Sequence, residues 1–282
     1  MTEGEAAPAA VTEQGARNLL LRVMAALVLA PLAIAIAYAG GWLWSGLVML
    51  AAIGLNVEWL MIVGTTRPMR GGAAGVVALA AAGFCLGSGR GTAALLVLAA
   101  GFAGVASTSA ERRGWTAAGF CYAAAAEMAS MLLRLDQVWG FVALIMVLLV
   151  VWGTDIGGYF AGRSVGGPKL WPRVSPKKTW AGAIGGFAAS LVISAGFAAF
   201  GIGGIGPLLL LGAALSIAAQ LGDLFESAVK RRFGVKDSSH LIPGHGGLLD
   251  RLDGFVAAVV LAAIFGLLRG GVDGVGRGLM VW

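Results

Sequence analysis

The chain is organised around the stretch GDLFESAVKRRFGVKDSSHLIPGHGGLLDRLD, residues 222–253. Acidic and basic residues are dense in it, and it holds both histidines of the chain, yet apolar runs long enough to cross a bilayer flank it on both sides. Charged groups beside hydrocarbon are costly and are rare there unless they serve a function. We therefore interpret this stretch as the catalytic centre of a membrane-embedded enzyme that acts on phosphates.

The composition is that of a membrane protein. Of the 282 residues, 59% are hydrophobic and 12% are charged, whereas soluble domains average about 45–50% and about 25%. Backbone polar groups must pair internally in lipid, so we predict an all-α, polytopic transmembrane helical bundle. The 46 glycines suit close helix packing. The net charge is +6. In a membrane protein the distribution of Lys and Arg reports the orientation in the bilayer, so we expect no nucleic-acid partner.

Hydropathy predicts about nine membrane-spanning helices, each near the length of about 20 residues that crosses a bilayer. The predicted spans are 22–39, 42–63, 72–88, 92–107, 116–133, 138–160, 181–200, 205–229 and 253–268. Arg17 and Arg22 before the first span are also typical of a signal peptide. Because many spans follow, we expect the first helix to be retained.

The basic residues predict the orientation. With the N-terminus in the cytosol, only four of the 20 Lys and Arg residues fall on the outer side. These four are Arg90, Arg134, Arg269 and Arg277. Such a bias is typical of membrane proteins with basic loops in the cytosol. It predicts a cytosolic N-terminus and two long cytosolic loops, one after the sixth span and one after the eighth.

We divide the chain into three parts. Residues 1–16 are predicted to be a disordered cytosolic tail, because they are Ala-rich with scattered acids and no apolar periodicity. Residues 17–137 are N-terminal transmembrane helices with few polar residues, chiefly Glu58 and Glu127. For these two acids, a buried carboxyl hydrogen-bonded to a neighbouring helix is a sufficient interpretation. Residues 138–282 form the C-terminal catalytic transmembrane region with its cytosolic loops.

One face of the eighth span carries candidate site residues. Asp223, Glu226, Ser227 and Lys230 fall at i, i+3, i+4 and i+7. A helix end with snorkelling side chains and local ion pairs is the plain alternative, and it accounts for Lys230. Acids do not snorkel easily, so we predict functions for Asp223 and Glu226.

The loop after this span leads into two more aspartates. Glycines around His245 allow a close backbone approach to a ligand and expose N–H groups to phosphate, although a simple turn has the same composition. Asp250 and Asp253 then lie at i and i+3 in the first turn of the ninth span. The helix dipole favours a carboxylate there, but it explains one acid better than two that flank Arg251.

Asp223, Asp250 and Asp253 are therefore predicted to converge at the cytosolic interface around a metal ion. Carboxylate ligands without thiolates favour Mg²⁺ over zinc. The nearby Lys and Arg residues suit a polyphosphate partner.

The end of the sixth span and the loop after it add further candidate site residues. They are Asp155, Arg163, Ser175, Lys177, Lys178 and Thr179. For the basic residues the alternative is attraction to anionic lipid, which is worth about 1 kcal/mol each. Asp155 lies in an apolar span, so we expect it to be functional or paired with a base of the loop.

Several of these segments together resemble a known family. They are Ser227–Arg231, Lys236–Asp237, His245–Gly247 and Asp250–Asp253. In that order and spacing they look like the diagnostic pattern of phosphatidate cytidylyltransferases, also called CDP-diacylglycerol synthases. Asp155–Arg163 and Ser175–Gly182 resemble the same family. The resemblance covers about the C-terminal half, and the first half matches in hydropathy and weakly at Glu58-Trp59.

The resemblance implies a membrane-bound, Mg²⁺-dependent homodimer that converts CTP and phosphatidate to CDP-diacylglycerol and pyrophosphate. It implies that Asp223 and Asp250 are metal ligands, with Asp253 close by and with K⁺ as a second cation of the site. The family commonly has an acid where this chain has Ala181. Whatever that acid does elsewhere is either not essential here or is done by another group.

The predicted site combines both lines of reasoning. Catalytic roles are assigned to Asp223, Lys230, Lys236, His245, Asp250, Arg251 and Asp253. Substrate-binding roles are assigned to Asp155, Arg163, Ser175, Lys177, Lys178, Thr179, Glu226, Ser227, Arg231, Asp237, Gly246 and Gly247. His245 is expected to hydrogen-bond a phosphate or orient an aspartate, and not to act as a base.

The substrates predict where the site lies. CTP is soluble and phosphatidate lies in the cytosolic leaflet, so the site is expected at the cytosolic side of the inner (cytoplasmic) membrane. Two other functions remain open. Another lipid phosphotransferase, such as a polyprenol kinase or a CDP-alcohol transferase, is one, although the latter needs a denser aspartate pattern on one helix. An anion or nucleotide transporter is the other, although transporters carry charge near the midplane in both halves.

Overall fold

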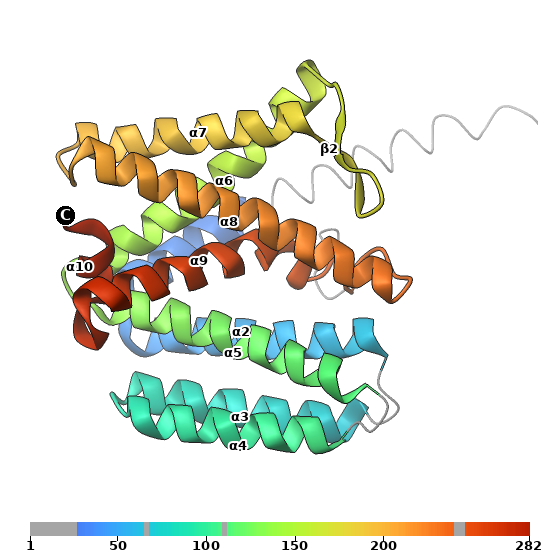
Figure 1. The fold of residues 1–282 in the computed structure, drawn as a ribbon. Helices are drawn as coiled ribbons and strands as arrows, with labels where there is room; N and C mark the ends of the chain where they lie inside the picture. The colour runs from blue at the N-terminus through green and yellow to red at the C-terminus, as the bar shows by residue number, and fades with distance from the viewer. Residues whose placement is uncertain (1–26, 65–67, 109–111, 240–245) are drawn as a thin grey trace, which may run out of the picture.

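The fold is a bundle of long helices, described by a computed structural model for residues 27–64, 68–108, 112–239 and 246–282 (Figure 1). A helix at Leu27–Ala39 comes first. The labelled long helices are α2 (Gly41–Val63), α3 (Pro68–Gly87), α4 (Gly91–Thr108), α5 (Arg113–Leu135), α6 (Gly140–Ser164), α7 (Trp180–Ala199), α8 (Ile205–Arg232) and α9 (Leu249–Gly270). The 3-10 turn η1 (Val272–Gly274) and the short helix α10 (Val275–Met280) follow.

The all-α membrane architecture agrees with the sequence. Within the described ranges, six helices are long and apolar enough to cross a membrane, namely α2 and α5 to α9. The predicted first, third and fourth spans appear there as shorter apolar helices, Leu27–Ala39, Gly72–Gly87 and Gly91–Ser107. Each predicted span thus contains a helix. Helix length and composition support six membrane crossings among the described residues, and the prediction of nine stays a prediction.

Two helices extend further into the charged stretch than their apolar runs. Helix α8 ends at Arg232 and not near residue 229, and α9 begins at Leu249 and not at residue 253. Basic residues stabilise a helix C-terminus and acidic residues an N-terminus. The last turn of α8 is basic, and the first turn of α9 contains Asp250. The acids of the site therefore lie on rigid helices.

A β-hairpin lies between α6 and α7, where the sequence predicted only a loop. Its strands β1 (Lys169–Trp171) and β2 (Ser175–Thr179) pair antiparallel. These strands, of three and five residues, are too short to show an apolar alternation, so hydropathy misses them. Side chains alternate across a strand, and in β2 Lys177 is exposed while Lys178 is half-buried.

Helix α9 is central to the bundle. It contacts α2, α5, α6, α8 and α10, whereas α3 and α4 pair with each other at one side and α6 pairs with α7 at the other. Figure 1 shows the hairpin, the end of α8 and the start of α9 at one end of the bundle, with α10 and the C-terminus at the other.

The surface is apolar and part of the interior is polar. Val192, Leu210 and Leu268 are 72%, 71% and 79% exposed, whereas Glu58 and Glu127 are 0% exposed. A water-soluble protein buries the first kind of side chain and exposes the second. The inverted arrangement is expected for a bundle whose outer surface faces lipid.

A glycine fixes the crossing of α8 and α9. A Cβ at Gly222 would lie 2.6 Å from the Asp253 carbonyl oxygen and 2.7 Å from the Ala257 Cβ. We expect Gly222→Ala to lower the free energy of unfolding by about 1–3 kcal/mol, because the helices must move apart. Thermal unfolding in detergent measures this. Gly206→Ala in the same helix is the control, since a Cβ there meets nothing within 4 Å, and equal losses in both variants would contradict the prediction.

Candidate active site

Carboxylates from three helices meet near the α8–α9 crossing. Asp155 lies on α6, Asp223 on α8 and Asp253 on α9. Gly222 packs against the Asp253 backbone, which brings the following residue, Asp223, beside α9. Asp223 interacts electrostatically with both Asp155 and Asp253, and those two also act on each other. We refer to these three residues as the acidic cluster.

The hairpin supplies the cation of this cluster. Lys178 of β2 forms an ion pair with Asp223, with their side chains 27% and 31% exposed. The same lysine attracts Asp155 and Asp253. Ser227 donates a long hydrogen bond of 3.4 Å to Asp223 Oδ1. One lysine thus faces three carboxylates, which leaves the cluster able to bind a further positive charge.

A second ion network joins α8 to α9. The Lys230 ammonium lies 2.7 Å from Glu226 Oε2 and 2.6 Å from Asp250 Oδ1. The Lys230, Glu226 and Asp250 side chains are only 13%, 2% and 13% exposed. Removing one partner from a buried ion network leaves an uncompensated charge and is strongly destabilising. Lys230 is therefore held between two acids and does not snorkel to the surface.

The Asp250 carboxylate is also hydrogen-bonded to the segment between the two helices. The Ser238 backbone N–H donates to Asp250 Oδ2 at 3.1 Å, and the Ser238 hydroxyl oxygen lies 3.0 Å from the same atom. The Gly247 N–H donates to the same oxygen at 3.1 Å. The sequence predicted that the Gly247 N–H faces a phosphate, whereas in the structure it donates to Asp250. Asp250 thus orders the start of α9, a structural role that the sequence did not predict.

Glu58, from the N-terminal half, joins this segment. Its Oε1 accepts hydrogen bonds from the Ser239 hydroxyl and the Leu248 N–H at 2.7 and 2.8 Å. Its Oε2 accepts from the Ser238 hydroxyl and the Leu249 N–H, both at 2.8 Å. The expectation that Glu58 bonds a neighbouring helix is confirmed. For Glu127 it is wrong within the described residues, where neither carboxylate oxygen has a hydrogen-bond partner.

Other predicted site residues have local roles or stay predictions. Thr179 caps α7, its Oγ1 accepting from the Gly182 N–H at 3.1 Å. Arg163 donates to the Tyr159 hydroxyl at 3.2 Å. Arg231 donates to the carbonyl of residue 235 at 3.4 Å. The remaining predicted site residues are exposed or half-buried, and their roles stay predictions. They are Ser175, Lys177, Lys236, Asp237, Gly246 and Arg251. His245 lies outside the described residues.

The chain's similarity to known proteins now identifies its family. The model of the cytidylyltransferase family matches residues 20–268. The chain belongs to this family. A phosphatidate cytidylyltransferase of Brucella suis biovar 1 (strain 1330) is 42% identical over 259 residues, which cover 89% of this chain and 94% of that protein. The Haemophilus influenzae protein of that name is 46% identical over 136 residues, which cover 46% of this chain and 47% of that protein. The one from Bacillus subtilis (strain 168) is 48% identical over 126 residues, which cover 44% of this chain and 46% of that protein.

The family resemblance implies Mg²⁺, and the acidic cluster fits such an ion. Among the described residues, no three His, Cys, Asp or Glu side chains are arranged to hold a metal ion by themselves. Mg²⁺ does not require this, because it usually keeps several waters and takes one or two carboxylates plus substrate phosphates. Asp223 and Asp253 supply hard oxygens and repel each other. An ion at Asp250, by contrast, would have to share that carboxylate with Lys230.

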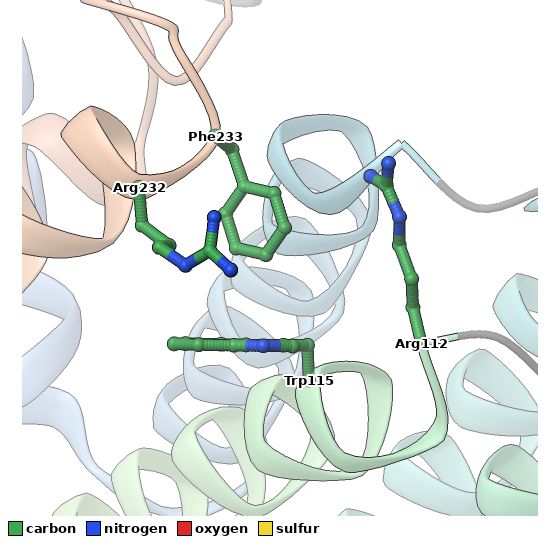
Figure 2. A pocket seen from close by; sticks show the side chains of 4 residues that line it. All are labelled: Arg112, Trp115, Arg232 and Phe233. Carbon is green, nitrogen blue, oxygen red and sulfur yellow. The ribbon is translucent and has the colours of Figure 1, made fainter.

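This cytidylyltransferase also has a pocket away from its carboxylates. It has a volume of about 390 Å³ and is lined by Arg112, Trp115, Arg232 and Phe233, from the start of α5 and the end of α8 (Figure 2). The Trp115 and Phe233 rings meet edge to face at 5.1 Å, and the Arg112 guanidinium lies 5.6 Å from the Phe233 centroid. Arg232 follows Lys230 by two positions, so the two face different sides of α8. The pocket is thus distinct from the ion networks.

Proposed function

We propose that the chain is an integral-membrane phosphatidate cytidylyltransferase, which converts CTP and phosphatidate to CDP-diacylglycerol and pyrophosphate. The observation that carries this is the 42% identity, over nearly the full length of both chains, to the Brucella suis protein of that name. The acidic cluster beside Lys178 supports it, because a reaction between two phosphates needs cations and fixed alignment more than titrating groups.

The chemistry is a substitution at the α-phosphorus of CTP. An oxygen of the phosphatidate phosphate forms a bond to that phosphorus, in line with the bond to the bridging oxygen of pyrophosphate. That second bond breaks, and pyrophosphate leaves with its electron pair. The second pKa of a phosphate monoester is about 6, so the attacking group is already an anion at neutral pH. The barrier is mainly repulsion between anions and their alignment, and no strong base is required.

The residues of the site divide this work. We propose that Asp223 and Asp253 hold Mg²⁺, with Asp250 one turn away on α9 and K⁺ as a second cation. When bound, such an ion neutralises phosphate charge and orients the reacting groups. Lys178 is 27% exposed, and its ammonium is suited to a phosphate of the nucleotide or lipid. Lys230 keeps a buried positive charge beside Asp250 and fixes α8 against α9.

The proposed placement has nine spans, a cytosolic N-terminus and the acidic cluster at the cytosolic side of the cytoplasmic membrane. Two observations support it. The hairpin and the end of α8, both rich in basic residues, lie at the same end of the bundle as the start of α9, as basic cytosolic loops would. CTP is soluble, while phosphatidate is drawn from the adjoining leaflet. A homodimer is proposed from the family resemblance.

An assay with purified protein in detergent tests the function and its metal. We expect labelled CTP and phosphatidate to give lipid-linked CDP and pyrophosphate in equal amounts. Chelation is expected to reduce the product to background, and added Mg²⁺ to restore it, because the acidic cluster would lack its ion. Diacylglycerol without phosphate is the control and should give no product. Uptake of CTP into vesicles without lipid-linked CDP would instead favour a nucleotide transporter.

A further inference from the structure

Glu58 connects parts of the chain that are far apart in sequence. It lies on α2, in the half of the chain that carries few polar residues. Its hydrogen-bond partners, Ser238, Ser239, Leu248 and Leu249, follow 180 to 191 positions later. All four belong to the segment that joins α8 to α9. A residue of the N-terminal half therefore contacts the segment that adjoins the proposed site.

The four hydrogen bonds hold both described flanks of that segment. Ser238 and Ser239 come a few residues after α8, and Leu248 and Leu249 begin α9. Each carboxylate oxygen takes one donor from each flank. A fully buried carboxylate is stable only while its hydrogen bonds are made. Glu58 thus keeps the two flanks together, and either flank released alone would leave the charge unsatisfied.

The same contacts reach the residues of the site. The Ser238 backbone N–H donates to Asp250, while the Ser238 hydroxyl, with its single proton, lies within hydrogen-bond distance of both Asp250 and Glu58. Leu249 precedes Asp250 in the first turn of α9, and Asp253 follows one turn later. Gly247 packs closely against Ser238 and Glu58. A Cβ at this glycine would overlap the Ser238 hydroxyl and lie 2.6 Å from Glu58 Oε2. The position of α9 relative to α8, and so of Asp253 relative to Asp223, depends on this contact.

We propose that Glu58 is a positioning residue for cytidylyl transfer, which acts by fixing the start of α9 so that Asp253 faces Asp223 and Asp250 faces Lys230 of α8. This inference rests on the proposed function. It also gives the N-terminal helices a part in the reaction, since α2 supplies the acceptor that orders the catalytic segment.

A matched pair of variants separates positioning from general burial. Glu58 and Glu127 are both fully buried acids of the N-terminal half, but Glu127 accepts no hydrogen bond from the described residues. Glu58→Gln keeps the size of the side chain and turns one acceptor into a donor, which then faces two N–H or O–H groups. Glu127→Gln makes the same chemical change without such partners.

We expect Glu58→Gln to lower kcat by about 10- to 100-fold, as loss of a supporting hydrogen-bond partner does in metal sites. KM for CTP should change far less, because alignment in the transition state is lost and not nucleotide binding. Hydrogen exchange should rise at 236–239 and 246–250 and stay unchanged in α3 and α4. Glu127→Gln should match the wild type in both measurements.

Further variants keep the test decisive. Glu58→Asp retains the charge with a shorter reach and should recover part of kcat. Ser239→Ala removes one donor to Glu58 and should give a smaller loss, which decides the matter if Glu58→Gln does not fold. Wild-type kcat and exchange in Glu58→Gln, or equal losses in Glu58→Gln and Glu127→Gln, would overturn the proposal. A wild-type protein without transferase activity overturns the proposed function instead, and the exchange experiment still tests the contact.

Discussion

Asp223→Asn is expected to lower CDP-diacylglycerol formation by at least about 10²-fold, the scale on which removal of one preorganised electrostatic group slows an enzyme. Asp223 is the member of the acidic cluster that forms the ion pair with Lys178. A neutral amide in its place cannot compensate the positive charge of a metal ion or of the Lys178 ammonium. The acid that pairs with Lys178 would be lost while Asp155 and Asp253 remain.

The same change is expected to leave stability nearly unaltered. The ion pair with Lys178 is about a third exposed, and exposed pairs contribute about 0–1 kcal/mol. Its loss is offset because Asp155 and Asp253 no longer face a third negative charge. The test combines kcat with thermal unfolding of purified protein. Asp273→Asn, in η1 near the C-terminal end of the bundle, is the control. Wild-type turnover in Asp223→Asn would remove this residue from the site.

Local patterns in the sequence predicted the helices well. Each apolar stretch predicted a helix, because the backbone has few alternatives in lipid. Errors occur where the apolar pattern stops. Helix α9 begins at Leu249, since polar residues with hydrogen-bond partners continue the helix outside the apolar run. The hairpin β1–β2 was missed because strands of three and five residues are too short for a periodic signal.

The site was predictable where its residues are close in sequence. The i, i+3 spacing places Asp250 and Asp253 on one helix, and hydropathy places Asp223 at the same end of the bundle. The choice between Lys177 and Lys178 was not predictable, because it depends on the alternation of a strand that the sequence does not reveal. Glu58 was predicted as a buried acid, but its partners lie some 180 residues away, and a single sequence contains no signal for such a pairing.

Asp250→Asn is expected to lower turnover as strongly as Asp223→Asn does, and for an additional reason. Asp250 accepts hydrogen bonds from the Lys230 ammonium, the Ser238 backbone N–H and the Gly247 N–H. An Asn side chain has one acceptor oxygen in place of two, and its NH₂ group would face donors. Lys230 would then have only Glu226 as a partner in this network, in a place where the side chains are mostly buried.

This predicts a loss of stability that Asp223→Asn does not show. Leaving buried donors unsatisfied costs about 1–3 kcal/mol, so we expect a lower free energy of unfolding together with the loss of kcat. Both variants should be assayed well below their unfolding temperatures, where each is folded. If Asp250→Asn proved as stable as the wild type, the hydrogen bonds that order the start of α9 would not matter to the fold. Asp250 would then act on the reaction in the same way as Asp223, by its charge alone.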